Sequence, residues 1–89
     1  ERLDEESVLL NRARNDEHWQ VRRAAVLRIH DDHTLRNRAH HDPEPQVRIC
    51  ALAKLTDAIE LRAIAKHDEV AEVRDAALRA LEQLTARPG

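Results

Sequence analysis

Residues 42–55 read Asp-Pro-Glu-Pro-Gln-Val-Arg-Ile-Cys-Ala-Leu-Ala-Lys-Leu, and the same pattern recurs at residues 16–29 and at residues 68–81, 26 positions apart. Each copy begins with Asp, and Val-Arg follows five residues later. Ala then stands nine residues after the Asp, and Val, Leu or Ile stands ten and thirteen residues after it. Further columns lie upstream of each Asp: Leu9, Leu35 and Leu61, and also Ala13, Ala39 and Ala65. Self-similarity at a fixed period is typical of repeat architectures.

Each copy predicts two helices. In the first copy the apolar residues from Val21 to Ile29 lie at i, i+4, i+5 and i+8, which is one face of a helix. The upstream Leu and Ala pairs are four residues apart and fit about two helical turns. We therefore expect a longer helix after each Asp and a shorter element, in part 3₁₀, before it. The shorter elements are expected at residues 7–14, 33–41 and 59–67.

Composition supports this prediction, because the chain has one Trp, no Phe, no Tyr, and mostly Ala, Leu, Val and Ile as apolar residues. Such a mixture favours helices over a β-sheet core. The breaks between helices carry Asp-Pro-Glu-Pro at residues 42–45 and acidic residues elsewhere. Pro45 suits a first helical turn. Asp31 and Asp57 precede two shorter elements, where unpaired backbone N–H groups favour a carboxylate.

The expected organisation is one all-α domain over residues 1–89. Three units are expected, at residues 7–32, 33–58 and 59–85, with a terminal linker at residues 86–89. Residues 1–6 look like the tail of a preceding unit, since Leu3 falls in the column of Ile29. A repeat unit does not bury its face alone. We therefore expect an upstream unit in a longer protein, and self-association through the first unit's open face is a further expectation.

The motif Asp-x-x-x-x-Val-Arg-x-x-Ala-Leu-x-x-Leu, at Asp42–Leu55 and Asp68–Leu81, resembles bacterial HEAT-like repeats of the type named after phycobilisome lyases. It is also similar to the leucine-rich repeat variant. The resemblance covers nearly the whole chain and implies a right-handed curved α-solenoid of helical hairpins. Families built on this repeat are mostly scaffolds, with some lyase and DNA-repair members. The resemblance therefore implies a protein-binding module, with a subunit of a lyase-type complex as an alternative.

Several function classes find no support in the residues. The net charge of −2 gives no strong attraction to nucleic acid, and no apolar run approaches the ~20 residues that span a bilayer. The lone Cys50 fits a reducing, cytoplasmic compartment. No phosphate loop or nucleophile motif is present, so we expect neither an enzyme nor a cofactor. The six His residues accompany one Cys, without the spacing of a structural zinc site, so no metal is expected.

The repeated Asp and Arg columns have a structural interpretation. The Asp is expected to accept backbone N–H bonds at its turn. The Arg six residues later is expected to pair with that Asp or with the Asp of the neighbouring unit, forming a ladder that fixes the stacking.

Function should then lie where the copies differ, on the surface of the longer helices that is off the buried stripe. In the first two units this surface carries apolar residues where solvent is expected, beside an Arg. Trp and Arg are enriched in binding hot spots, and adjacent exposed apolar residues mark interaction sites. The alternative is that Trp19 and Leu27 pack on an upstream unit or fill the bend between units. The expected partner-binding residues are Trp19, Arg23, Leu27 and Ile49.

The shorter elements carry a basic stripe in which Glu60 is the single acid. This stripe could contact nucleic acid or another polyanion. Alternatively, acids were drawn to the helix starts and left bases on the helix bodies. The polyanion interpretation lacks aromatic residues to stack on bases. The residues of the stripe are Arg12, Arg14, Arg36, Arg38, Arg62 and Lys66.

Overall fold

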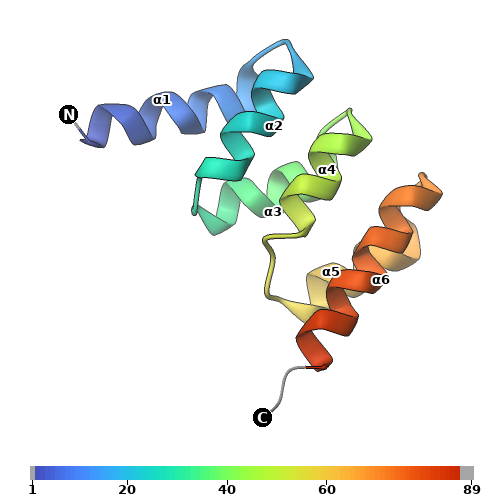
Figure 1. Ribbon diagram of the computed structural model, residues 1–89. Coiled ribbons are helices and arrows are strands. Elements are labelled where there is room, and N and C mark those ends of the chain that lie inside the picture. The colour runs from blue at the N-terminus through green and yellow to red at the C-terminus, as the bar shows by residue number, and fades with distance from the viewer. Residues whose placement is uncertain (1, 87–89) are drawn as a thin grey trace.

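The computed structural model describes residues 2–86, and every regular element in that range is an α-helix (Figure 1). The all-α class predicted from the apolar periodicity is confirmed. Residue 1, and residues 87–89 of the expected terminal linker, lie outside the described residues. The helices are α1 (Arg2–Asn15), α2 (Trp19–Arg28), α3 (Asp32–His41), α4 (Pro45–Leu52), α5 (Ala58–His67) and α6 (Ala71–Thr85).

The helices upstream of the repeated Asp are regular α-helices: α3 and α5 begin one residue before the expected ranges 33–41 and 59–67, and α1 begins earlier than the expected residue 7. α3 and α5 each span 10 residues, as many as α2 and more than the 8 residues of α4. The expectation of short, partly 3₁₀ elements was therefore wrong. The Leu and Ala pairs mark only the buried stripe, and polar residues continue the helix on its solvent side. α1 also runs unbroken from Arg2, so residues 2–5 form no turn after a preceding helix.

The acidic residues between helices act in two ways. Asp31 and Asp57 are N-caps whose side chains accept backbone N–H bonds from Thr34 and Ile59, as expected. The repeated Asp instead stands two residues before the N-cap of an even-numbered helix and accepts the N–H of that N-cap residue. The three bonds join His18 N to Asp16 Oδ1, Glu44 N to Asp42 Oδ1, and Val70 N to Asp68 Oδ1, each 2.9 Å long.

Each odd-numbered helix packs against the even-numbered helix that follows it, and α4 also packs against both α2 and α6. Figure 1 shows α2, α4 and α6 side by side toward the viewer, with α3 and α5 behind them. The smallest dimension of the Cα trace is 16 Å, which corresponds to two layers of helices. The core lies between these layers.

The repeated apolar columns supply that core, as predicted. Val47, Ala51 and Leu61 are fully buried, and their equivalents in other copies are mostly buried as well. The main exceptions lie in the first and last helix pairs, where no further pair covers them within the described residues. The buried members of the columns are Ala13, Ala25, Val26, Ile29, Leu35, Ala39, Val47, Ala51, Leu52, Leu55, Leu61, Val73 and Ala77.

A lysine after α4 joins two of the even-numbered helices. Lys54 Nζ donates to the carbonyl oxygens of Val26, Leu27 and Ile29 at 3.0, 2.9 and 2.6 Å. These carbonyls lie at the C-terminal end of α2, where a cation is favourable because the helix dipole is negative there.

We expect Lys54→Ala to lower the free energy of unfolding by about 1–2 kcal/mol, since three charge-assisted hydrogen bonds are lost from a partly exposed group. Lys66→Ala is the matched control, because Lys66 is exposed near the end of α5. Urea unfolding followed by circular dichroism measures both variants. If both substitutions lowered the free energy of unfolding equally, Lys54 would contribute only its charge and not its three hydrogen bonds.

No helix among residues 2–86 combines the length and the apolar character that crossing a bilayer requires.

Candidate functional site

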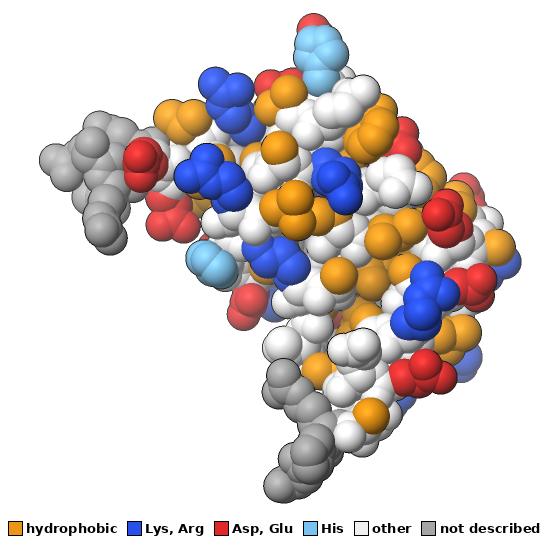
Figure 2. All heavy atoms as spheres, viewed as in Figure 1, with side chains coloured by type: hydrophobic (Ala, Val, Ile, Leu, Met, Phe, Trp, Pro, Cys, Tyr) orange, Lys and Arg blue, Asp and Glu red, His pale blue; other side chains and the backbone are white. Residues whose placement is uncertain are grey.

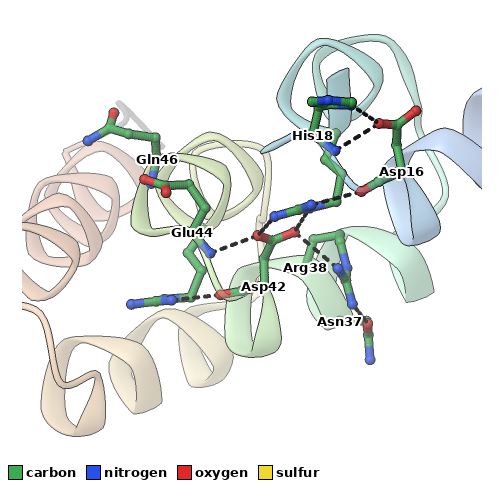
Figure 3. A network of polar contacts seen from close by, with 9 residues as sticks. Asp16, His18, Asn37, Arg38, Asp42, Glu44 and Gln46 are labelled. Carbon is green, nitrogen blue, oxygen red and sulfur yellow. Dashed lines mark hydrogen bonds and ion pairs between the residues drawn. The ribbon is translucent and has the colours of Figure 1, made fainter. Parts of the chain in front are cut away.

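The repeated Asp and Arg residues form a connected network around Asp42 (Figure 3). The Arg22 guanidinium donates to both carboxylate oxygens of Asp42, with Nε–Oδ2 at 2.8 Å and Nη2–Oδ1 at 3.0 Å. Arg38 Nη1 donates to the same Oδ2 at 3.0 Å. Asp42 is 0% exposed at its side chain, so this carboxylate is fully paired rather than free for a partner.

The same arrangement repeats one helix pair further along. Arg48 donates to Asp68 at 2.9 and 3.2 Å, as Arg22 does to Asp42. Each Arg also donates through Nη1 to the backbone carbonyl of the Asp six residues before it. These bonds join Arg22 to Asp16 O, Arg48 to Asp42 O, and Arg74 to Asp68 O, at 2.8, 2.6 and 2.7 Å.

The predicted ladder is therefore confirmed, and it uses both partners that the sequence left open. The guanidinium takes the side chain of the next Asp and the backbone of its own. The hydrogen bonds to Asp42 raise the pKa of Arg22 above its ordinary value, against the opposing effect of burial. The Arg22 side chain is 10% exposed, so the ladder stabilises the stacking of helix pairs and leaves this guanidinium little access to a ligand.

The predicted partner-binding residues lie on two adjacent helices. Trp19, Arg23 and Leu27 follow one another at four-residue intervals on α2, so they share one side of that helix. Leu27 is 55% exposed and Arg23 is exposed, whereas Trp19 is partly buried and packs against the core. The alternative was that Trp19 packs within the repeat array rather than facing a partner. It applies in part, because the Trp19 side chain packs against the core of this chain.

Ile49 lies on α4, next to Cys50, whose Sγ is 3.9 Å from the Arg23 carbonyl oxygen. Ile49 is partly buried and lines a hollow of about 550 Å³ between α4 and α6. The lining of this hollow is mixed: it includes the apolar Leu52, Ala76 and Leu84 and the polar Lys54, Arg79 and Gln83. α4 packs against α2, and Ile49 lies one helix away from the α2 residues, where it lines the hollow shared with α6. We call Trp19, Arg23, Leu27 and Ile49 the inner surface.

Charge is distributed unevenly across the even-numbered helices. α2 and α4 contain no acidic residue, whereas α6 contains Glu72, Asp75 and Glu82. In Figure 2, hydrophobic and basic side chains share the part of the visible face over α2 and α4, and acidic side chains gather toward α6. No ion pair to Arg23 is found within residues 5–86. The inner surface therefore combines apolar area with an available positive charge.

The residues predicted as a polyanion-binding stripe differ in exposure and in their contacts. Arg38 is 14% exposed and bound to Asp42, and Arg14 donates to Thr34 Oγ1 at 2.9 Å. Arg12 lies in the first helix pair, in a hollow lined by residues of α1 and α2. Arg36 is partly exposed, and Arg62 and Lys66 are exposed. The stripe is thus interrupted at Arg38, whereas Arg14 keeps 45% of its side chain exposed beside its bond to Thr34.

Cys50 and some of the His residues contact other groups of the fold. His40 Nε2 lies 2.7 Å from Glu60 Oε1, and the rings of His40 and His41 are 5.9 Å apart. No group of three or more His, Cys, Asp or Glu side chains is arranged to hold a metal ion in the described part of the chain. Burial raises the pKa of the Cys50 thiol above its ordinary value, so the nucleophilic thiolate is disfavoured at neutral pH.

Two polar features that join neighbouring helix pairs were missed from the sequence. Arg28 and Lys54 occupy the same repeated position, and a column with two basic residues was the available signal. Thr34 accepts bonds from Arg14 and donates to Asp31 Oδ2 at 2.7 Å. The Thr34 hydroxyl and backbone N–H lower the pKa of the Asp31 carboxyl. Polar residues in these columns thus connect neighbouring helix pairs, and they vary too much between copies to be recognised.

Comparisons with protein-family models, with curated proteins and with solved structures find no match for this chain.

Proposed function

We propose that this chain is a HEAT-like repeat module, a right-handed solenoid of three helix pairs, that binds a protein partner through its inner surface and performs no catalysis. The 26-residue columns and the ladder between successive pairs support the repeat assignment. In such a module, residues that differ between copies are the ones available for recognition.

The observation that carries the proposal is Leu27, which is 55% exposed on an acid-free helix beside Arg23. An aliphatic side chain this exposed has no role in the core of the chain, and the neighbouring guanidinium adds direction and charge specificity. Trp19 is held partly buried, so it offers a rigid aromatic edge at little further loss of conformational entropy.

The charge distribution indicates which partner fits. With basic residues on α2 and no acid on α2 or α4, a segment that carries Leu or Ile next to Asp or Glu complements the inner surface. α6 carries Glu72, Asp75 and Glu82 as well as Arg74 and Arg79, so it attracts the acidic end of such a segment less than α2 does. The segment should therefore lie with its acidic part over α2 and its apolar part toward Ile49.

Selection from a random peptide library displayed on phage tests this proposal. We expect enriched peptides to pair an acidic residue with a large aliphatic one. Trp19 is the single Trp of the chain, so its fluorescence reports binding at the inner surface directly. Arg23→Glu and Leu27→Asp should each weaken a selected peptide by at least about tenfold, which is typical of a hot spot.

The matched controls are Arg62→Glu, which removes an exposed Arg of α5, and Leu78→Asp, which changes a Leu of comparable exposure outside the inner surface. Both should leave peptide affinity within about twofold. Peptides without acids, or peptides indifferent to Arg23→Glu, would contradict the proposal. Binding of an oligonucleotide that requires Arg62 instead would favour the polyanion alternative.

A further inference from the structure

The first and last helix pairs leave apolar surface uncovered. Val26 and Leu52 share a repeated position and are 0% and 1% exposed, whereas Leu78, at this position in α6, is 51% exposed. At the opposite end Ala24 is exposed, whereas its equivalents Cys50 and Ala76 are buried. A neighbouring helix pair covers the buried members of each column. The two ends therefore retain the kind of surface that the internal junctions bury.

These surfaces have defined compositions. We call the uncovered surface of the last helix pair the C-end face and that of the first helix pair the N-end face. The C-end face contains Lys66, Arg74 and Leu78, which stand at repeated positions whose members in the preceding pair contact the next pair. The N-end face borders a hollow of about 530 Å³ between α1 and α2. Its lining includes Val8, Leu9, Val21 and Ala24, with Arg12 and Arg28 at the sides. An aliphatic side chain such as Leu78 fits the chemistry of this hollow.

The ladder also has two open ends. Arg74 Nη1 donates to Asp68 O at 2.7 Å, which places its guanidinium as Arg22 and Arg48 are placed. No carboxylate accepts from Arg74 among the described residues, although Arg22 and Arg48 each bind the Asp 20 residues later. The Asp16 carboxylate accepts the His18 N–H, as the Asp42 and Asp68 carboxylates accept the N–H of their N-cap residues. No guanidinium donates to the Asp16 carboxylate within the described residues, where Arg22 reaches only the Asp16 backbone carbonyl. One end thus offers a donor and the other an acceptor.

We propose that the 89-residue chain associates head to tail, with the C-end face of one copy covering the N-end face of a second copy and Arg74 pairing with Asp16 of that copy. The contact repeats the junction seen between α3–α4 and α5–α6, where Arg48 pairs with Asp68. Such a heterologous contact leaves one face free on each outer copy, so association continues as an open chain rather than stopping at a dimer.

The intermolecular junction lacks a contact that is made at the first internal junction, between α1–α2 and α3–α4. At the internal junction, Lys54 binds carbonyl groups where α2 ends. The corresponding residues 78–81 lie inside α6, which continues to Thr85, so their carbonyls are used within the helix. Arg28 of a second copy therefore makes no equivalent contact. We expect association to depend on concentration between about 10 µM and about 1 mM.

A charge exchange tests the pairing by sedimentation velocity. Arg74→Glu places two carboxylates at the junction, and Asp16→Arg places two guanidinium groups there, so each variant alone should stay monomeric. In a mixture of the two variants, every junction between unlike copies again joins one carboxylate to one guanidinium, and association should return. Failure of the mixture to associate, while both variants keep the helical circular dichroism of the parent chain, overturns the proposal.

An added ion pair should strengthen the contact. Arg14 binds Thr34, and His40 binds Glu60, always 20 residues apart. If the 26-residue pattern continues from one copy into the next, the same spacing places Lys66 of one copy opposite Val8 of the next copy. Val8 is 49% exposed. Val8→Glu should therefore tighten association about two- to fivefold at low salt, as expected for an exposed pair. Weaker association, or no change, would contradict this register.

A final pair of variants separates this proposal from binding at the inner surface and does not depend on the charge exchange. Leu78→Asp should abolish association, whereas Leu27→Asp, which alters a Leu of similar exposure, should leave it unchanged. For peptide binding we expect the reverse: Leu27→Asp should weaken it, and Leu78→Asp should leave it unchanged. If Leu27→Asp abolishes association and Leu78→Asp does not, the copies meet through the inner surface and head-to-tail association is excluded.

Discussion

Replacing Asp42 with Ala should lower the free energy of unfolding by about 3–5 kcal/mol. The Asp42 carboxylate is 0% exposed and accepts bonds from Arg22, Arg38 and the Glu44 N–H. Its removal leaves two largely buried guanidinium groups without an anion. A chain of this length has a total stability of about 4–13 kcal/mol, so the variant should be largely unfolded at moderate temperature.

Asp16→Ala is the matched control, because Asp16 occupies the same position in its turn. The Asp16 carboxylate accepts the His18 N–H and lies 3.5 Å from the His18 ring, but it binds no Arg side chain among the described residues, since Arg22 reaches only the Asp16 backbone carbonyl, which Ala keeps. Its loss should cost about 0.5–1.5 kcal/mol, the contribution of one turn hydrogen bond. Urea denaturation followed by far-ultraviolet circular dichroism measures both. Equal losses would mean that the turn bond, and not the ladder, carries the stability.

Leu52→Ala should lower the free energy of unfolding by about 2–5 kcal/mol, because it leaves a cavity in a fully packed site. Leu52 is 1% exposed, at the junction between α4 and α6. The surrounding backbone belongs to helices held by the ladder, so the cavity cannot collapse easily.

Leu78→Ala makes the same chemical change at the same repeated position, where the side chain is 51% exposed. At a concentration where the chain is monomeric, we expect a loss below about 1 kcal/mol, since little apolar area is withdrawn from water at this site. Thermal unfolding at low protein concentration compares the two. Similar losses would show that Leu78 is covered in solution, as it would be in a head-to-tail assembly.

Much of the helix arrangement could be predicted from the columns. Val47 and Leu61 are buried because an α-helix has about 3.6 residues per turn, which brings the apolar residues of each helix to one side. The Asp and Arg columns predicted a ladder, but not which atoms join. Arg22 is 6 residues from Asp16 and 20 from Asp42, and only packing brings the more distant carboxylate to its guanidinium.

The candidate site was harder to predict. Trp19 and Leu27 share a side of α2, as their spacing indicated, yet Trp19 is partly buried and Leu27 is not. Arg14 and Arg38 were expected on an open basic stripe, and the fold uses them to bind Thr34 and Asp42. Spacing along a helix reports direction around its axis, whereas exposure also depends on the helices beside it.

The sequence by itself determined the helical class, the burial of the Val, Leu and Ala columns, and the pairing of Asp with Arg, because these follow from local periodicity and charge. Only the tertiary structure decided which members of a column are covered and which polar groups remain available. Val26 and Leu78 occupy the same position in the repeated pattern, but α4 packs against α2 and covers its side, whereas no helix of the described chain covers that side of α6. Whether a residue is buried depends on the helix packed beside it, so burial cannot be read from the spacing of residues within one helix.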